Sequence, residues 1–211
     1  VYLNKGETGS VTFIGTVSPA GGNLKEPVTE STKKAARCFY ALSQNRADSK
    51  RYPAIDTLDS YSKYLEYPEF IEFSKEKLDE NWVELVNEAR NILVRGKETE
   101  EQINILGDDS VPIDYHVTLW KSEFVDFVIL QQDAFDKIDA TTSLERQEFM
   151  LKKVINVTRS EFKFEGFEEV GTYFKRLINV FRQMNYTVFK SDEFHKVEAE
   201  ANAVLEERII K

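Results

Sequence analysis

The chain has 211 residues, and its 28 lysine and arginine residues against 37 aspartate and glutamate residues give a formal net charge of −9. Because contact with nucleic-acid phosphates needs clustered basic side chains, an acidic chain without a concentrated basic run is not expected to bind nucleic acid. Hydrophobic residues make up 41% of the sequence, which is enough to build a buried core. No window approaches the roughly 18 apolar residues of a membrane span, so the sequence predicts a soluble protein.

Glycine and proline are concentrated in residues 1–64, which also contain two β-like runs, at residues 11–16 and 37–42. Two strands are marginally stable without further partners, so this part is expected to lean on the rest of the chain or on strands that lie upstream of it. Their exposed edges are expected to recruit a neighbouring molecule. Cys38 is the only cysteine; it excludes an internal disulfide, and its apolar neighbours predict a buried, inert thiol.

Beyond Tyr64 the apolar residues recur at helical spacing. Because proline restricts the residue before it, Tyr67-Pro68 supports a boundary near Tyr64, with domains at residues 1–64 and 65–211. We expect the first stripe to end near Gly96, the second to start at Pro112 and the last to be capped by Ser191. The five stripes are Trp82, Leu85, Val86, Ala89 and Leu93; Val117, Trp120, Phe124, Phe127 and Val128; Phe149, Met150, Val154 and Val157; Phe167, Val170, Phe174, Leu177, Ile178 and Phe181; and Phe194, Val197, Ala201, Val204 and Leu205.

A search for chemistry within the chain assigns no catalytic residue and no metal ligand. The phosphate-binding pattern G-x-x-x-x-G-K-[ST] is absent, and the glycines of residues 6–10 favour a hairpin turn instead. His116 and His195 lack an i+4 histidine partner and no cysteine pair exists, which favours histidines that lie on the surface or support neighbouring residues over metal ligands. There is no G-x-S-x-G segment, and the acidic clusters are explained by exposed helix faces.

Two aromatic residues lie where a core side chain is not required. Tyr52 follows the second β-like run, and Phe135 stands in a polar stretch after the helix that contains Trp120. An aromatic ring from each position could hold a flat base by stacking. Residue types and spacing by themselves favour structural packing for either ring, so both interpretations stay open at this point.

Several segments, in this order and spacing, resemble the catalytic A subunit (alpha chain) of V-type and archaeal-type ATP synthases. They include Gly9–Thr29, Tyr52-Pro53-Ala54-Ile55-Asp56, Ser60-Tyr61-Ser62-Lys63-Tyr64 and Leu130-Gln131-Gln132-Asp133-Ala134-Phe135-Asp136. The segment that starts at Tyr52 is also similar to the beta subunit of F-type ATP synthases. The resemblance extends over essentially the whole chain.

The resemblance implies a mainly α fold, in which a helical C-terminal domain follows the last strands of an incomplete α/β, RecA-like nucleotide-binding domain. It implies that the phosphate loop lies upstream of Val1, so that the 211 residues alone are inactive and hold no cofactor tightly. In the full-length subunit it implies ATP or ADP with Mg²⁺, and coupling of ATP hydrolysis or synthesis to H⁺ or Na⁺ transport. The implied partners are B subunits in an alternating A3B3 ring and the central rotor stalk, in a cytoplasmic head that meets the membrane only indirectly.

The same resemblance implies two sets of site residues. Tyr52 corresponds to the aromatic residue that stacks on adenine, and Ala134 and Phe135 correspond to the other wall of that pocket. The loop Ser18-Pro19-Ala20-Gly21-Gly22-Asn23 corresponds to an inner loop that faces the rotor. Tyrosine replaces the family's usual phenylalanine at position 52 and keeps a stacking ring, whereas Asn23 replaces an aspartate and removes a charge from the loop.

The alternative hypothesis is a stand-alone helical interaction module that binds a protein through its phenylalanine-rich helices and has no nucleotide role. An upstream G-x-x-x-x-G-K-T segment would discriminate between the two, because only the ATPase subunit requires one.

Overall fold

The computed structural model describes residue 6 and residues 9–210. The chain divides into two compact units, Val1–Phe39 and Tyr40–Lys211, and each is described by itself. The domain boundary expected near Tyr64 stays a prediction. The hairpin turn expected at residues 6–10 falls partly on residues 7 and 8, which lie outside the described residues.

The described residues of the first unit contain one α-helix, α1 (Pro27–Ala35), preceded by a single 3-10 turn, η1 (Ala20–Gly22). Pro27 is the first residue of α1, a position where its fixed φ suits a helix and its missing N–H is not needed. The strand predicted at residues 11–16 is wrong: they form no strand with any part of the chain that the structure describes, and Phe13 is 93% exposed. A β-prone sequence forms a strand only where a partner supplies hydrogen bonds.

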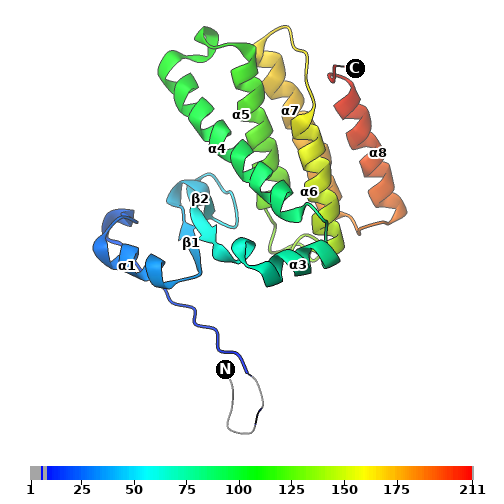
Figure 1. Cartoon of the computed structure of the whole chain (residues 1–211). Coiled ribbons are helices and arrows are strands. Elements are labelled where there is room, and N and C mark those ends of the chain that lie inside the picture. The colour runs from blue at the N-terminus through cyan, green and yellow to red at the C-terminus, as the bar shows by residue number, and fades with distance from the viewer. Residues whose placement is uncertain (1–5, 7–8, 211) are drawn as a thin grey trace. The chain divides into compact units, whose positions relative to one another are not determined.

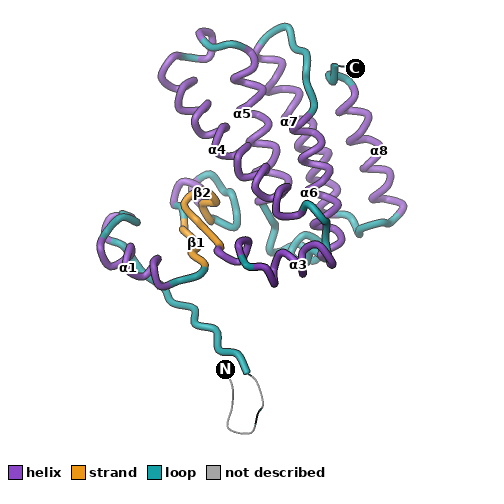
Figure 2. The backbone as a smooth tube through the Cα atoms, viewed as in Figure 1, coloured by secondary structure: helices purple, strands orange, loops and turns teal. Residues whose placement is uncertain are grey.

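The second predicted strand is confirmed as β1 (Cys38–Leu42), and it pairs with β2 (Ile55–Ser62) to form a two-stranded sheet. Figure 2 shows these two strands among helices and loops. A side chain reinforces the pairing, because Ser60 Oγ accepts a hydrogen bond of 3.0 Å from the backbone N–H of the buried Ala41. The sheet has no third strand within the described residues, so its outer edges are unpaired there.

Short helices connect this sheet to a bundle. Helix α2 (Gln44–Asp48) lies between the strands, and η2 (Lys63–Glu66) and α3 (Pro68–Lys77) follow β2. The bundle consists of α4 (Trp82–Leu106), α5 (Ile113–Val125), α6 (Leu144–Arg159), α7 (Phe167–Tyr186) and α8 (Asp192–Glu206). Figure 1 shows α4 to α7 side by side, with α8 beside α7. The predicted helical domain is therefore confirmed.

Helix α7 provides the centre of the core. Its residues Phe174, Leu177 and Phe181 have no exposed surface, and the ring of Phe181 meets that of Phe124 on α5 edge to face, with centroids 4.9 Å apart. The five predicted apolar stripes lie on α4 to α8, except that Phe127 and Val128 of the second stripe fall in the π-helical segment Asp126–Leu130 directly after α5. The predicted cap Ser191 starts α8 by accepting a 3.1 Å hydrogen bond from Phe194 N. None of the helices in the described residues has the length and apolar character needed to cross a membrane.

Helix α4 runs past the point where the sequence predicts its end. Gly96 is not a terminus but a buried residue in mid-helix, and α4 ends at Gly107, whose φ of 88° is a conformation that glycine adopts readily. The reason for a glycine at position 96 is packing. A Cβ atom there would lie 2.1 Å from Cβ and Oγ of Ser122 on α5, so only glycine lets the two helices approach this closely.

Two further expectations are corrected by the structure. The Cys38 side chain is half-buried rather than buried, because β1 has one open face. His116 is neither exposed nor near a metal site: it is 4% exposed, its Nε2 lies 3.1 Å from the carbonyl oxygen of Asp108, and its ring stacks on Phe167. In the part of the chain that the structure describes, no cluster of potential metal ligands occurs.

The contact between Gly96 and Ser122 predicts a specific stability defect. Gly96→Ala is expected to lower the free energy of unfolding by about 1–3 kcal/mol, because the added methyl overpacks the α4–α5 interface. Urea denaturation followed by circular dichroism measures the change.

The double variant Gly96→Ala/Ser122→Gly is the control, since it removes the two atoms that the methyl would meet. We expect the two substitutions to be coupled, with the double variant more stable than the sum of the single effects allows. Strict additivity would show that the contact with Ser122 is not the reason for glycine at position 96.

Candidate functional site

Tyr52 lies on the loop between α2 and β2, at a position where its ring is largely free of the core. Its side chain is 51% exposed, and its hydroxyl donates a long hydrogen bond of 3.4 Å to the carbonyl oxygen of Ala47. The peptide bond to Pro53 is cis. About half of the residue surface is therefore open to a ligand.

Phe135 lies in a compact turn that follows η4 (Asp126–Leu130), a π-helical extension of α5. Carboxylates hold this turn together: Asp139 Oδ2 accepts a 2.6 Å hydrogen bond from Asp133 N, and Asp133 Oδ1 accepts one of 2.9 Å from Phe135 N. Asp136 Oδ1 accepts two more, from the backbone N–H groups of Ile138 and Asp139 at 2.8 and 2.9 Å. The backbone is thus fixed while the side chain of Phe135 is 98% exposed.

A backbone hydrogen bond joins these two loops. Gln132 N donates to the carbonyl oxygen of Tyr52 at 2.8 Å, so the structure brings the Tyr52 loop to the start of the turn that carries Ala134 and Phe135. Ala134 is also exposed. Neither ring has an aromatic partner among the described residues, which leaves both ring faces available to a flat ligand.

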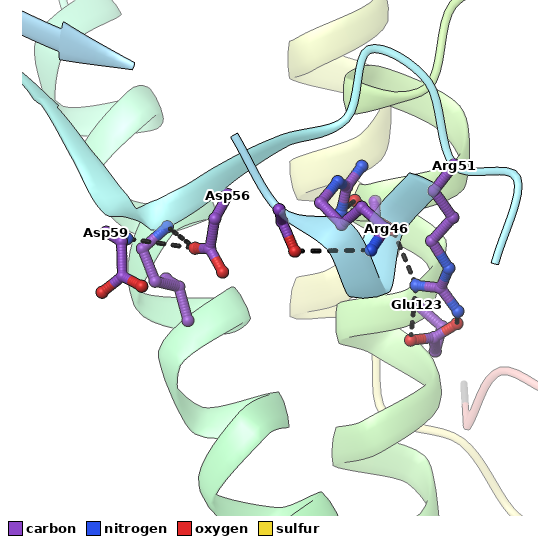
Figure 3. Close-up of polar contacts among 8 residues, drawn as sticks. Arg46, Arg51, Asp56, Asp59 and Glu123 are labelled. Carbon is purple, nitrogen blue, oxygen red and sulfur yellow. Dashed lines mark hydrogen bonds and ion pairs between the residues drawn. The ribbon is translucent and has the colours of Figure 1, made fainter. Parts of the chain in front are cut away.

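A cluster of four charged side chains anchors the Tyr52 loop to the end of α5. Figure 3 shows Arg51 reaching Glu123, with Arg46 beside it. The Arg51 guanidinium donates to both carboxylate oxygens of Glu123, at 3.1 and 2.7 Å, and to Asp126 Oδ2 at 2.7 Å. Arg46 Nη1 donates to the other oxygen of Asp126 at 2.7 Å. The carboxylate of Asp126 therefore bridges two arginines.

The electrostatics of the cluster follow from this geometry. Burial of the Arg51 guanidinium opposes its charged form, but the hydrogen bonds and charges of Glu123 and Asp126 outweigh that effect and hold its pKa above the ordinary value. The guanidinium also lies over the ring of Phe127, 4.6 Å from its centroid, which adds a cation–π contact. The residue directly before Tyr52 is thus fixed by several independent interactions.

The sequence contains no signal for this cluster. Arg51 and Glu123 are 72 residues apart, and neither belongs to a recognisable motif. The turn at Asp56 is more local: its Oδ1 accepts hydrogen bonds from Leu58 N at 2.8 Å and Asp59 N at 3.0 Å, which bends β2 just after the Tyr52 loop (Figure 3).

The predicted rotor-facing loop lies in the other compact unit. Residues Ser18 and Ala20–Asn23 are exposed. Gly21 and Gly22 have φ values of 62° and 73°, which residues with a Cβ atom rarely adopt. The turn is closed by hydrogen bonds from Gly22 N to Pro19 O at 3.1 Å and from Asn23 N to Ala20 O at 3.2 Å. Asn23 also closes the turn, since its Oδ1 accepts from Lys25 N at 3.0 Å.

Comparison with known proteins identifies the family of the chain. Residues 2–62 match the ATP synthase alpha/beta family, nucleotide-binding domain, and residues 72–164 match the C-terminal domain of V and A type ATP synthase. The V-type ATP synthase alpha chain of Borrelia duttonii (strain Ly) is 39% identical over 198 residues, which cover 94% of this chain and 32% of that protein. The V-type ATP synthase alpha chain of Protochlamydia amoebophila (strain UWE25) is 37% identical over 208 residues, 99% of this chain and 35% of that protein.

A solved structure agrees at the level of the fold. The ATP synthase subunit NeqB from Nanoarcheaum equitans superposes with a TM-score of 0.51 and 20% identity, over 67% of this chain and 33% of that chain. The end of a nucleotide-binding domain followed by a helical C-terminal domain defines the class. The chain belongs to the family of V-type ATP synthase alpha chains, and it spans about a third of the length of the curated relatives it matches.

The charged cluster predicts unequal costs for its two carboxylates. Asp126→Asn is expected to lower the free energy of unfolding by about 3 kcal/mol, because it leaves two arginines beside an uncharged, buried partner. Glu123→Gln removes a more exposed carboxylate, and its expected cost is about 1 kcal/mol or less. Urea denaturation compares the two variants.

Glu88→Gln serves as the control, because Glu88 forms a bidentate ion pair with Arg159 that is exposed on the surface. Its expected effect is close to zero. Equal effects for all three variants would contradict a central role for Asp126.

Proposed function

We propose that this chain supplies the adenine-binding aromatic residues and the helical domain of the catalytic subunit of a rotary ATPase. The observation that carries the proposal is the 2.8 Å hydrogen bond from Gln132 N to Tyr52 O, which joins two loops that each present an exposed side chain suited to stacking. In this proposal Tyr52 forms one wall of the adenine pocket, and Ala134 and Phe135 form the other.

Physical chemistry supports stacking over hydrogen-bond recognition at this place. Phe135 is 98% exposed, and contact between its apolar ring and water is unfavourable. Hydrogen bonds from backbone N–H groups to the carboxylates of Asp133 and Asp136 fix the turn that carries Phe135, while its side chain stays unburied. A purine base would cover such a surface and gain stacking energy. The position of Tyr52 is fixed through its neighbour Arg51, which forms ion pairs with Glu123 and Asp126.

The wider function is proposed on the same basis. The subunit would bind ATP or ADP with Mg²⁺, alternate with B subunits in an A3B3 ring, and couple ATP hydrolysis or synthesis to H⁺ or Na⁺ transport. It would work in the cytoplasmic head, peripheral to the membrane. The phosphate groups and Mg²⁺ would be held by residues outside these 211, because the chain has no phosphate-binding pattern.

The exposed turn at Ser18–Asn23 is proposed to face the central rotor stalk. Its two glycines have positive φ and no side chain, so at these two positions another surface can approach the backbone closely. Asn23 is occupied within the turn by Lys25 N, so the contact that we propose relies on shape more than on charge.

Replacement of Tyr52 tests the adenine assignment in the assembled ATPase. Tyr52→Ala is expected to weaken nucleotide binding by about 1–3 kcal/mol, because it removes a stacking face and no phosphate contact. The measurement is steady-state ATP hydrolysis, where the change should appear as a raised KM with kcat largely retained.

Tyr52→Phe is the matched control, since it keeps the ring and removes only the 3.4 Å hydrogen bond to Ala47 O. It should behave like the unmodified protein. An unchanged KM for Tyr52→Ala in a complex that still assembles would refute the assignment of Tyr52 to the adenine pocket.

The isolated 211-residue chain provides a second test. It is expected to show no ATP hydrolysis above background and only weak ATP binding, because one or two stacking contacts do not offset the entropy lost on association. A phosphate-release assay and isothermal titration calorimetry measure the two quantities. Turnover by a preparation free of contaminating ATPases would contradict the proposal.

A further inference from the structure

A cavity of about 850 Å³ opens within the unit Tyr40–Lys211, and its walls come from β2, α4, α6 and the α5–η4 junction. This volume falls in the range of small-molecule pockets, roughly 300–1,000 Å³. Tyr52, Ala134 and Phe135 do not line it, although the cavity borders the proposed adenine site through Gln132, whose N–H donates to Tyr52 O.

Much of the cavity lining is apolar. It includes the large hydrophobic side chains of Trp82, Val86, Leu93, Val128, Met150 and Leu151. These six come from three different elements and provide both an aromatic face and branched aliphatic surface. Such a lining suits the hydrocarbon or aromatic body of a small molecule.

The charged residues of the lining are Glu66, Arg90, Asp139 and Arg146, and of these Arg146 is only 4% exposed. Its guanidinium has five N–H donors, but within the described residues it makes a single hydrogen bond, from Nη2 to the carbonyl oxygen of Met184 at 2.5 Å. No carboxylate of that part of the chain forms an ion pair with it. Its Nε and Nη1 atoms make no hydrogen bond within the described residues and are therefore open to an acceptor supplied by a ligand.

Gln131 adds an unmatched acceptor to the same cavity. Its Oε1 atom is buried and has no hydrogen-bond partner among the described residues. Because buried polar atoms are nearly always paired, this oxygen indicates a missing donor. The cavity thus presents both an under-used cation and an unpaired acceptor beside an apolar wall.

The nearby carboxylate of Asp139 does not fill the role of the missing anion. One of its oxygens is already bonded to Asp133 N at 2.6 Å, and it makes no ion pair with Arg146 within the described residues. Burial raises the pKa of Asp139, although the Asp133 N–H and the charge of Arg146 oppose this shift. The charges of Asp139 and Asp136 act on Arg146, but within the described residues no carboxylate contacts its guanidinium directly.

We infer that this cavity binds a small amphiphilic organic anion, with its oxyanion group on Arg146 and its apolar body against Trp82, Val86 and Met150. An N–H or O–H group on the ligand would donate to Gln131 Oε1. The inference does not depend on the proposed adenine site, and it assigns the cavity to a ligand other than the substrate nucleotide.

Two dyes with the same aromatic body distinguish the contribution of the charge to binding from that of the apolar contact. 8-Anilinonaphthalene-1-sulfonate carries a sulfonate, whereas N-phenyl-1-naphthylamine is its neutral analogue. Fluorescence titration of the 211-residue chain should show binding of both. Arg146→Gln should lower the affinity for the sulfonate dye at least tenfold and change the affinity for the neutral dye by less than twofold. Arg146→Lys should retain part of the affinity for the sulfonate dye that Arg146→Gln loses.

Arg176→Gln is the charge-matched control, because Arg176 pairs with Glu207 on the surface and does not line the cavity. It should change neither dye. Tyr52→Ala and an excess of ATP should also leave both titrations unchanged. Displacement by ATP would mean that the anion site is the nucleotide site and would overturn the inference, while leaving the proposed function intact.

A filling variant keeps the test decisive if Arg146→Gln does not fold. Val86→Trp retains Arg146 and occupies the apolar side, so it should abolish the binding of both dyes while near-UV circular dichroism still shows a cooperative transition. Persistent dye binding in folded Val86→Trp, equal weakening of both dyes by Arg146→Gln, or no binding to the unmodified chain would each overturn the inference.

Discussion

The carboxylate of Asp126 is the interaction on which the proposed site depends. Its side chain is almost fully buried and receives one guanidinium on each oxygen, Arg46 at 2.7 Å and Arg51 at 2.7 Å. A single carboxylate thereby fastens the segment between β1 and β2 to the helical bundle. Because both contacts are charge-assisted and shielded from water, they are stronger and less sensitive to salt than surface pairs.

The position of Asp126 in the chain increases its influence. It is the first residue of η4, where the backbone changes from α-helical to π-helical bonding, and its carbonyl oxygen accepts a 2.9 Å hydrogen bond from Gln131 N. The wider π turn delivers the chain to Gln132, which bonds to Tyr52 O. The same short segment therefore anchors the Tyr52 loop by its side chain and by its backbone.

Close helix packing makes that anchor rigid. Gly96 lets α4 approach α5 at Ser122, one residue before Glu123, so α5 is packed closely just before the two acidic residues that bind the arginines. Asn185 of α7 also donates a buried 2.8 Å hydrogen bond to the carbonyl oxygen of Val128 within η4. A π-helical segment leaves backbone groups in unusual positions, and this side chain satisfies one of them.

The sequence by itself determined the helical elements and the family. Apolar spacing predicts all five helices of the bundle, because an amphipathic helix repeats its buried face every three or four residues whatever it packs against. The segments around Tyr52 and Gln131–Phe135 carry the resemblance, and the family matches confirm it. Tyr52, Ala134 and Phe135 could be proposed as a site only through that resemblance, since spacing alone favoured packing.

Only the tertiary structure decided which distant residues meet and which local signals fail. Residues 11–16 have the composition of a strand but pair with no other strand in the part of the chain that the structure describes. The sequence predicts a helix end at Gly96, whereas the close contact with Ser122 is the reason for a glycine there. The pairing of Arg51 with Glu123 and Asp126, and the unpaired groups of Arg146 and Gln131 around one cavity, join residues far apart in the sequence. Charge and hydrogen-bond pairing have no period along a chain, so they become visible only when the packed helices fix the distances between side chains.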